Sequence, residues 1–194
     1  MHLADLHRLF RTSIIALGVL CLFWSFFVTH IMAAWLDLLP LHTGPENENL
    51  AIYGPFDWIE VRWSLVLVLA FTSAMPLTSI LIQRFSHPGL LPSERSWLSA
   101  VLLISTILVP LLIIAVWALV IPKLIGFAKL AGSLDGVAVS YDAASVFSVA
   151  LGTSWILIVW SLTVISIGLA RLYGLIEVSE TRLRYRILII SGGT

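Results

Sequence analysis

The sequence predicts an all-α polytopic membrane protein, a bundle of helices that cross a bilayer. The chain has 194 residues, of which 59% are hydrophobic and 11% charged, whereas roughly 25% of the residues in a soluble domain are charged. Its mean hydropathy is +1.02. Four apolar runs are each long enough to cross a hydrocarbon core about 30 Å thick. These observations together exclude a soluble globular domain.

The elements follow in order along a single transmembrane domain, 1–194. Residues 2–11 predict a short amphipathic helix lying on the membrane surface, because leucines share one face and charged residues the other. Four spans are expected at about 12–36, 63–82, 97–121 and 143–170, with Pro76 and Pro110 as kinks inside the second and third. Pro122 is expected to end the third span, and Asp142 to be the N-cap of the fourth. From about residue 187 another apolar stretch indicates the start of a fifth span.

A short polar segment, here called the hinge, separates the second and third spans. It reads Phe85-Ser-His-Pro-Gly-Leu-Leu-Pro-Ser-Glu94-Arg95. Two prolines without backbone donors and a permissive glycine forbid a continuous helix through it. The hinge is therefore a forced turn, with Glu94 at the start of the next helix.

Lysines and arginines favour cytoplasmic loops and so predict the orientation. A cytoplasmic N-terminus puts eight arginines inside and three basic residues outside. The inner set is Arg8, Arg11, Arg84, Arg95, Arg171, Arg182, Arg184 and Arg186, and the outer set is Arg62, Lys123 and Lys129. We therefore expect the hinge to face the cytoplasm. Tryptophans at 35, 58, 63 and 117 are expected at the outer interface and Trp97 at the inner one.

Several functional classes are not supported by the sequence. The net charge is zero, so nothing indicates nucleic-acid binding. The single Cys21 excludes an intrachain disulfide, and the five histidines show no metal-ligand spacing. No cofactor is implied, and no cleavable signal peptide is evident. Motifs of intramembrane or serine enzymes are missing, so no catalytic residue is expected.

Six segments in the same order resemble the TatC family, the multispanning receptors of the twin-arginine protein translocase. The hinge pattern Phe85-x-x-Pro88-Gly89-Leu90-x-x-x-Glu94-Arg95 resembles the first cytoplasmic loop of that family. The other five segments are His2-Leu3-Ala-Asp5-Leu6, Pro55-Phe56, Pro122-x-x-x-Gly126-Phe127, Val139-Ser-Tyr-Asp142-Ala-Ala-Ser145, and Gly174 with Leu183-Arg-Tyr-Arg186. Agreement across essentially the whole chain is more specific than any one motif.

The resemblance implies a receptor in the cytoplasmic membrane of a prokaryote that recognises paired-arginine signal peptides and helps to export folded proteins. Its partners would be TatA- and TatB-type single-span proteins in an oligomeric complex. By the resemblance, Glu94 and Asp5 would recognise the arginine pair, with Phe85, Pro88, Leu90 and Arg95 completing the signal-peptide site. From the residues alone, Glu94 is also explained as a first-turn acid at a helix N-terminus, and Asp5 as a solvated acid.

The chain departs from the family pattern at three points. Leu162 stands where the family has an acidic or amide residue in the fourth span, and Ala34 stands where it has a proline. The family has six spans, so the sequence is either truncated or a divergent relative. The alternative function is a small polytopic transporter or channel subunit, although paired intramembrane charges along a pathway are missing.

Overall fold

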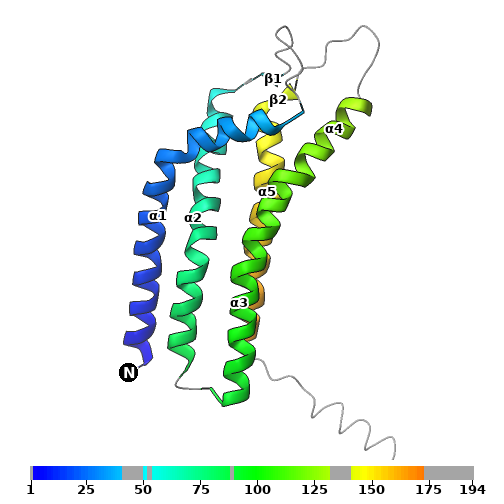
Figure 1. Cartoon of the computed structure of the whole chain (residues 1–194). Helices are drawn as coiled ribbons and strands as arrows, with labels where there is room; N and C mark the ends of the chain where they lie inside the picture. Colours follow the sequence, from blue (N-terminus) through cyan, green and yellow to red (C-terminus); the bar gives the residue numbers. More distant parts are fainter. Residues whose placement is uncertain (1, 41–49, 52–53, 88–89, 132–140, 173–194) are drawn as a thin grey trace, which may run out of the picture.

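The structure is a computed structural model that describes residues 2–40, 50–51, 54–87, 90–131 and 141–172. Nearly all of these residues are helical, which confirms the predicted fold class. Figure 1 shows long helices running side by side. The elements are α1 His2–Leu38, β1 Leu50–Ala51, α2 Pro55–Ser86, α3 Pro92–Ala115, the π-helix η2 Val116–Val120, α4 Ile121–Ala131, β2 Tyr141–Asp142 and α5 Ala143–Leu172.

Four helical segments are long and apolar enough to cross a membrane, namely His7–Leu38, Phe56–Ser86, Pro92–Ala128 and Ala143–Ala170. Large apolar side chains such as Phe26, Ile14 and Ile156 are exposed along them. In water such a surface would be unfavourable, whereas lipid tails solvate it. The chain is therefore a multi-pass membrane protein.

The expected surface helix at 2–11 and the span at 12–36 are one continuous helix, α1. No proline or glycine separates Arg11 from Thr12. The Thr12 hydroxyl donates to the Arg8 carbonyl oxygen, 2.9 Å away, a bond back to the preceding turn of the same helix and not the cap of a new one. The amphipathic pattern at 2–11 therefore coincides with no break in the backbone of α1.

The third helix does not end at Pro122, while the exit of the third span from the membrane at this residue stays a prediction. The helical path continues through α3, η2 and α4 as far as Ala131. The wider turn of η2 lies directly before Pro122, and π-turns are one way in which a helix accommodates an interruption of its regular ladder. Pro76 and Pro110 lie inside α2 and α3, where the helices likewise continue.

The predicted N-cap at Asp142 is confirmed. Its Oδ1 accepts from the backbone N–H of Ala144 at 3.2 Å, and its Oδ2 accepts from that of Ser145 at 3.1 Å. These bonds satisfy two of the first N–H groups of α5, which have no partner within the helix. Asp142 is also the last residue of β2, which pairs with β1 in parallel, with Tyr141 opposite Leu50 and Asp142 opposite Ala51.

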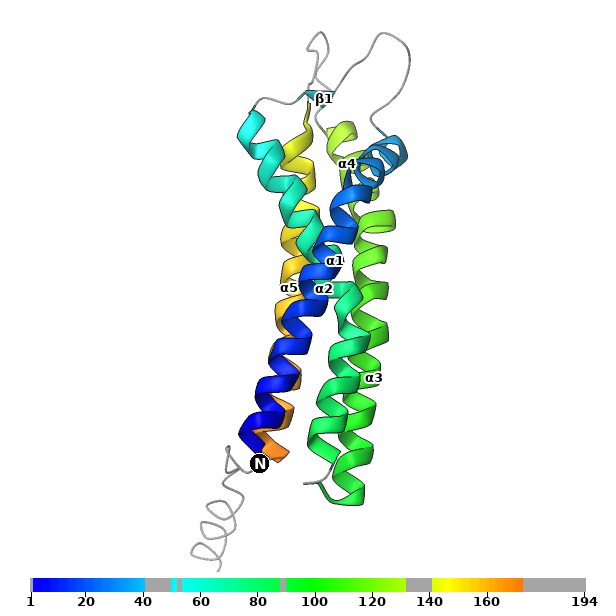
Figure 2. The ribbon, with the colours of Figure 1, turned by 90° about the vertical axis from the view of Figure 1, so that its left-hand side faces the viewer.

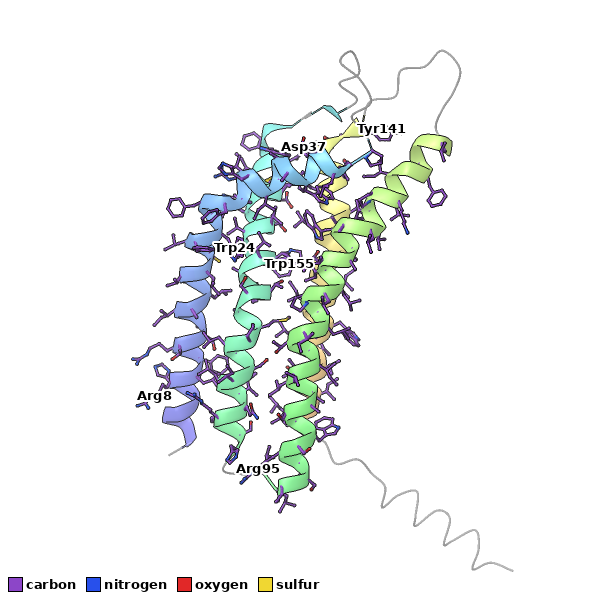
Figure 3. The ribbon with its side chains drawn as sticks, in the orientation of Figure 1. Arg8, Trp24, Asp37, Arg95, Tyr141 and Trp155 are labelled. Carbon is purple, nitrogen blue, oxygen red and sulfur yellow. The ribbon has the colours of Figure 1, made fainter. Side chains whose placement is uncertain are left out.

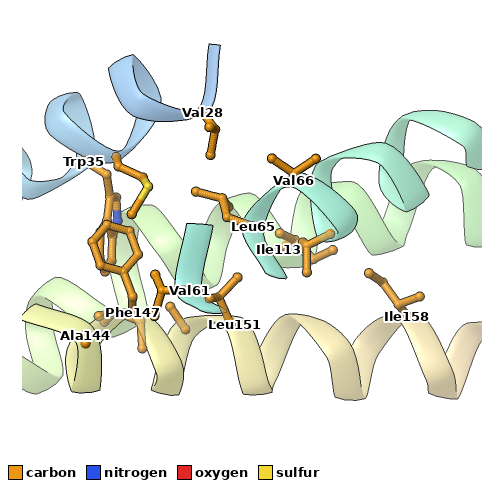
Figure 4. Close-up of a cluster of buried hydrophobic side chains, with 14 of the residues drawn as sticks. Val28, Trp35, Val61, Leu65, Val66, Ile113, Ala144, Phe147, Leu151 and Ile158 are labelled. Atoms are coloured by element: carbon orange, nitrogen blue, oxygen red, sulfur yellow. The ribbon is translucent and has the colours of Figure 1, made fainter. Parts of the chain in front are cut away.

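The main core lies between α1, α2, α5 and the α3–η2 segment. Figure 4 shows part of it, where Trp35 and Phe147 lie together and Val61, Leu65 and Leu151 complete the contact. The ring centroids of Trp35 and Phe147 are 4.6 Å apart, and only 5% of Trp35 is exposed. Trp35 is therefore a core residue, although the sequence predicted an outer-interface residue.

Indole N–H groups connect the helices. Each donates to an acceptor on a neighbouring helix within the apolar layer, where an unsatisfied donor would be costly. The bonds are Trp24 to Ser73 Oγ, 3.0 Å, Trp155 to Ser64 Oγ, 2.9 Å, Trp117 to Ser154 Oγ, 2.9 Å, and Trp35 to the Trp117 carbonyl, 2.8 Å. Figure 3 shows Trp24 and Trp155 in the middle of the bundle.

Candidate functional site

The hinge joins α2 to α3 at one end of the bundle, which we call the hinge end. Helix α2 ends at Ser86, and the backbone N–H of His87 still bonds to the Gln83 carbonyl oxygen. Leu91 is extended, with φ −67° and ψ 156°, because the following Pro92 disfavours helical geometry before it. Pro92 then starts α3 at a position where its missing donor costs nothing. Pro88 and Gly89 lie outside the described residues, so their predicted part in the turn stays a prediction.

Glu94 caps the start of α3. Its Oε2 accepts a hydrogen bond of 2.9 Å from the backbone N–H of Leu91, and the side chain is half-buried. Leucine has no side-chain acceptor, so this is the glutamate half of a capping box. This bond confirms that Glu94 acts as an acid at a helix start. Within the part of the chain that the structure describes, its Oε1 makes no hydrogen bond.

Arg95 stabilises the turn through two hydrogen bonds to the backbone of the hinge. Its Nε donates to the Leu90 carbonyl oxygen at 2.9 Å, and its backbone N–H donates to the Leu91 carbonyl oxygen at 2.9 Å. Leu90 is 6% exposed and packs with Leu98, Leu102 and Ile165. Because a buried leucine anchors the turn and Arg95 holds its carbonyl, the backbone before Glu94 has one defined path.

The remaining predicted residues are placed less completely. Phe85 is half-buried in the last turn of α2. Asp5 belongs to α1, but its side chain lies outside the described residues. Figure 3 places Arg8 and Arg95 at the same end of the bundle, so the start of α1 and the hinge share that end. This shared end does not by itself bring Asp5 into contact with Glu94.

Trp97 also belongs to the hinge end, whereas the sequence predicts it only as a residue of the inner membrane interface. It follows Glu94 by three positions in α3 and is 46% exposed. Its ring lies against Gly168 of α5, where an added Cβ would meet the indole Cη2 at 3.1 Å. The spacing of three residues could have indicated that Trp97 and Glu94 are neighbours on one face.

Two cavities open between the helices. One, of about 330 Å³, lies between α1, α2, α3 and α5 and is lined by Leu162, Ile165, Ser13 and Met75 among others. Its polar side chains include Ser79 and Thr106, whose hydroxyls bond to each other at 2.7 Å. The other, of about 370 Å³, is almost entirely apolar, and Ala34 lines it. The two positions where the chain departs from the family pattern thus each line a cavity.

Nothing at the hinge end indicates a metal centre. Within the described ranges, no group of three or more histidine, cysteine, aspartate or glutamate residues could hold a metal ion. The candidate site is therefore one carboxylate at a helix start, held by an ordered turn, with an aromatic ring one turn along. Such an arrangement is suited to binding a cationic group.

Comparisons with known proteins agree with the resemblance. The family model described as "Sec-independent protein translocase protein (TatC)" matches residues 1–191. A crystal structure of a twin-arginine translocase receptor, TatC, in the detergent DDM has the same fold, with a TM-score of 0.67 and 21% identity. That match covers 98% of this chain and 84% of the other. No curated protein matches the chain. Since the family model spans nearly the whole sequence, the chain belongs to the TatC family.

Proposed function

We propose that this chain is a receptor component of the twin-arginine translocase and binds the paired arginines of signal peptides at the hinge end. One observation carries the proposal. Glu94 presents a half-buried carboxylate at the start of α3, on a turn held by Arg95, with Oε1 free within the described part of the chain. Family membership supplies the class of ligand.

Guanidinium and carboxylate match in geometry as well as charge. A guanidinium has a fixed fork of donors that can reach a carboxylate in two places, whereas a lysine ammonium acts as a point charge. A charge-assisted hydrogen bond contributes about 1.5–3 kcal/mol where water is partly excluded, but only about 0–1 kcal/mol on an open surface. Because Glu94 is half-buried, we expect its bond to a guanidinium to contribute a free energy between these limits.

Asp5 and Phe85 complete the proposed site, together with Pro88 and Leu90. Leu90 and Arg95 act through the turn, since one is buried and the other bonds to its carbonyl. Asp5 would approach from the start of α1, at the same end of the bundle. The proposal places this end in the cytoplasm, where the excess of arginines favours it.

The test compares three substitutions of Glu94 in the full chain, reconstituted in nanodiscs and titrated with a labelled Arg-Arg signal peptide. Glu94→Gln keeps an acceptor for the Leu91 N–H and removes the charge. Glu94→Ala removes both, and Glu94→Asp keeps the charge on a shorter stem. We expect Glu94→Gln to weaken binding about five- to tenfold, because one charged contact is lost.

Photo-crosslinkers placed at Phe85 and Glu94 give a second measurement. We expect both to capture the Arg-Arg peptide and to capture a Lys-Lys variant poorly. Crosslinkers at exposed Trp63, in the opposite half of α2, serve as the control. If the hinge positions capture no Arg-Arg peptide while a six-span TatC does so in the same membranes, the proposed function is wrong.

The proposal includes TatA- and TatB-type single-span partners. Leu162 is 47% exposed and lines the cavity between the four long helices, so this position presents an apolar surface to any neighbour. We expect Leu162→Gln to increase co-purification of a single-span partner, because an amide in lipid gains from an interhelical hydrogen bond. Unchanged retention in Leu162→Gln membranes would show that the partner binds elsewhere.

A further inference from the structure

Trp97 and Glu94 lie side by side on one face of α3. They are three residues apart, and residues at this spacing are surface neighbours on a helix. The Trp97 indole is 46% exposed, and Glu94 is half-buried. A ligand that reaches the Glu94 carboxylate from the surface therefore passes within reach of the indole.

Gly168 of α5 holds the indole in place. A Cβ added there would lie 3.1 Å from Cη2 and 3.3 Å from Cζ3 of Trp97, closer than ordinary van der Waals contact. The benzo edge of the indole thus fills the space that a side chain at position 168 would occupy. One edge of the ring is packed on α5, and nearly half of the side chain remains exposed.

Two guanidinium groups would have to share the one carboxylate whose side chain is described at the hinge end. Glu94 is the carboxylate at the hinge end whose side chain the structure describes, and its Oε2 already accepts the Leu91 N–H. The other described carboxylates belong to the opposite end of the bundle: Asp37, Asp57, Glu60 and Asp142. Among the described side chains beside Glu94, the exposed Trp97 ring can therefore add a second contact to a bound guanidinium.

We propose that Trp97 is a specificity-determining residue of the site, whose exposed indole face stacks on a guanidinium of the arginine pair beside the Glu94 carboxylate. A guanidinium is planar and weakly hydrated, so it stacks on an aromatic face better than an ammonium does. Trp97 thus adds to the preference for arginine over lysine. This inference rests on the proposed function of the hinge end.

The experiment measures the affinities of an Arg-Arg peptide and its Lys-Lys variant for the full chain in nanodiscs. Trp97→Leu removes the ring, and Trp97→Phe keeps a smaller one. We expect Trp97→Leu to weaken binding of the Arg-Arg peptide about two- to fivefold. This range corresponds to the loss of one exposed cation–π contact. The Lys-Lys affinity should change less, so the ratio of the two affinities falls.

Trp63→Leu is the matched control for a general effect of losing an exposed tryptophan. Trp63 is 56% exposed and lies in α2 at the opposite end from the hinge. The Trp63→Leu substitution should leave both affinities unchanged. Trp97→Phe should keep most of the preference for the Arg-Arg peptide. If Trp97→Leu weakens both peptides equally, or changes neither, Trp97 is a membrane-interface anchor and the inference is wrong.

Gly168→Ala provides a variant that leaves the indole in the chain and moves it. The added methyl group must displace the ring edge by a few tenths of an ångström. We expect a smaller fall in the affinity ratio than for Trp97→Leu. Gly152→Ala on the same helix is the control, because a Cβ there meets nothing within 4 Å. If the ratio of the Arg-Arg to the Lys-Lys affinity is the same for Gly168→Ala, Gly152→Ala and wild type, packing on α5 does not set the position of the Trp97 ring.

The two proposals fail in different ways. If the wild-type chain does not distinguish the Arg-Arg from the Lys-Lys peptide, the proposed function falls, and the role of Trp97 falls with it. If the wild type distinguishes them and Trp97→Leu distinguishes them equally well, only the role of Trp97 is overturned.

Discussion

The indole N–H of Trp35 in α1 donates a hydrogen bond of 2.8 Å to the backbone carbonyl oxygen of Trp117 in η2. Ile121, which would serve this carbonyl in an α-helix, donates instead to Val116. The donor that would serve it in the π-register is residue 122, which is proline and has no N–H. Trp35 thus satisfies an acceptor that the local helix leaves open, and it ties the end of α1 to η2. Figure 2 shows from a second direction that the last turns of α1 lie at the same end of the bundle as α4.

Trp35→Phe should destabilise the protein by about 1–2 kcal/mol, because the Trp117 carbonyl loses its partner in an apolar environment. The unfolding free energy in detergent, titrated with denaturant, measures this. Pro122→Ala restores a backbone N–H near the open carbonyl, so Trp35→Phe should cost less in that background. The same cost in both backgrounds would contradict the assignment.

Ser154→Ala should destabilise the protein by about 0.5–1.5 kcal/mol, because the Trp117 indole loses its acceptor at 2.9 Å. Ser161 on the same helix is equally buried, at 0% exposed, but its hydroxyl has no partner among the described residues. Ser161→Ala is therefore expected to be neutral or slightly stabilising. Thermal unfolding measures the stability of the two variants. An equal loss of stability would show that packing, and not the hydrogen bond, accounts for both effects.

Asp142→Ala should weaken the start of α5 by about 0.5–2 kcal/mol through loss of its cap, whereas Asp142→Asn should retain most of it. Hydrogen exchange provides a local measurement. We expect faster exchange at the Ala144 and Ser145 amides in Asp142→Ala, since both donate to this carboxylate. Unchanged protection of these two amides would refute a capping role.

Arg95→Ala should loosen the hinge, because the Leu90 carbonyl loses its contact with Nε. Faster hydrogen exchange over residues 90–95 and an about two- to threefold lower affinity for the Arg-Arg peptide are expected, as for one exposed interaction. Arg84→Ala is the control, since this exposed arginine in the last turn of α2 carries the same charge. Identical effects of the two substitutions would mean that charge alone, and not the turn, is involved.

Local chemistry explains why much of the fold was predictable. Apolar runs predicted the four spans, and Asp142 predicted the start of α5, since a cap needs only the next three residues. The Pro- and Gly-containing hinge predicted the turn for the same reason. The surface helix at 2–11 was predicted as a separate element because amphipathicity reports exposure, which can change along an unbroken helix.

Part of the candidate site was also predictable. Glu94 was identified both as a helix-start acid and as the proposed arginine ligand, and the structure shows the first of these roles. Trp97 was not assigned to the site, because its neighbour Gly168 lies on another helix and no sequence pattern connects the two. The cavity lined by Leu162 is likewise formed by four helices together, so no single segment of the sequence predicts it.

The amino-acid pattern alone establishes a membrane helix bundle of the TatC family, with a turn at Phe85–Arg95 and a carboxylate at the start of the next helix. These are properties of composition and of short-range geometry. That Trp35 serves the Trp117 carbonyl, that the helix passes Pro122 and that Trp97 packs against Gly168 becomes visible when the helices are packed together. Each depends on hydrogen bonds and close packing between distant segments, which hold helices together in lipid because apolar burial alone cannot.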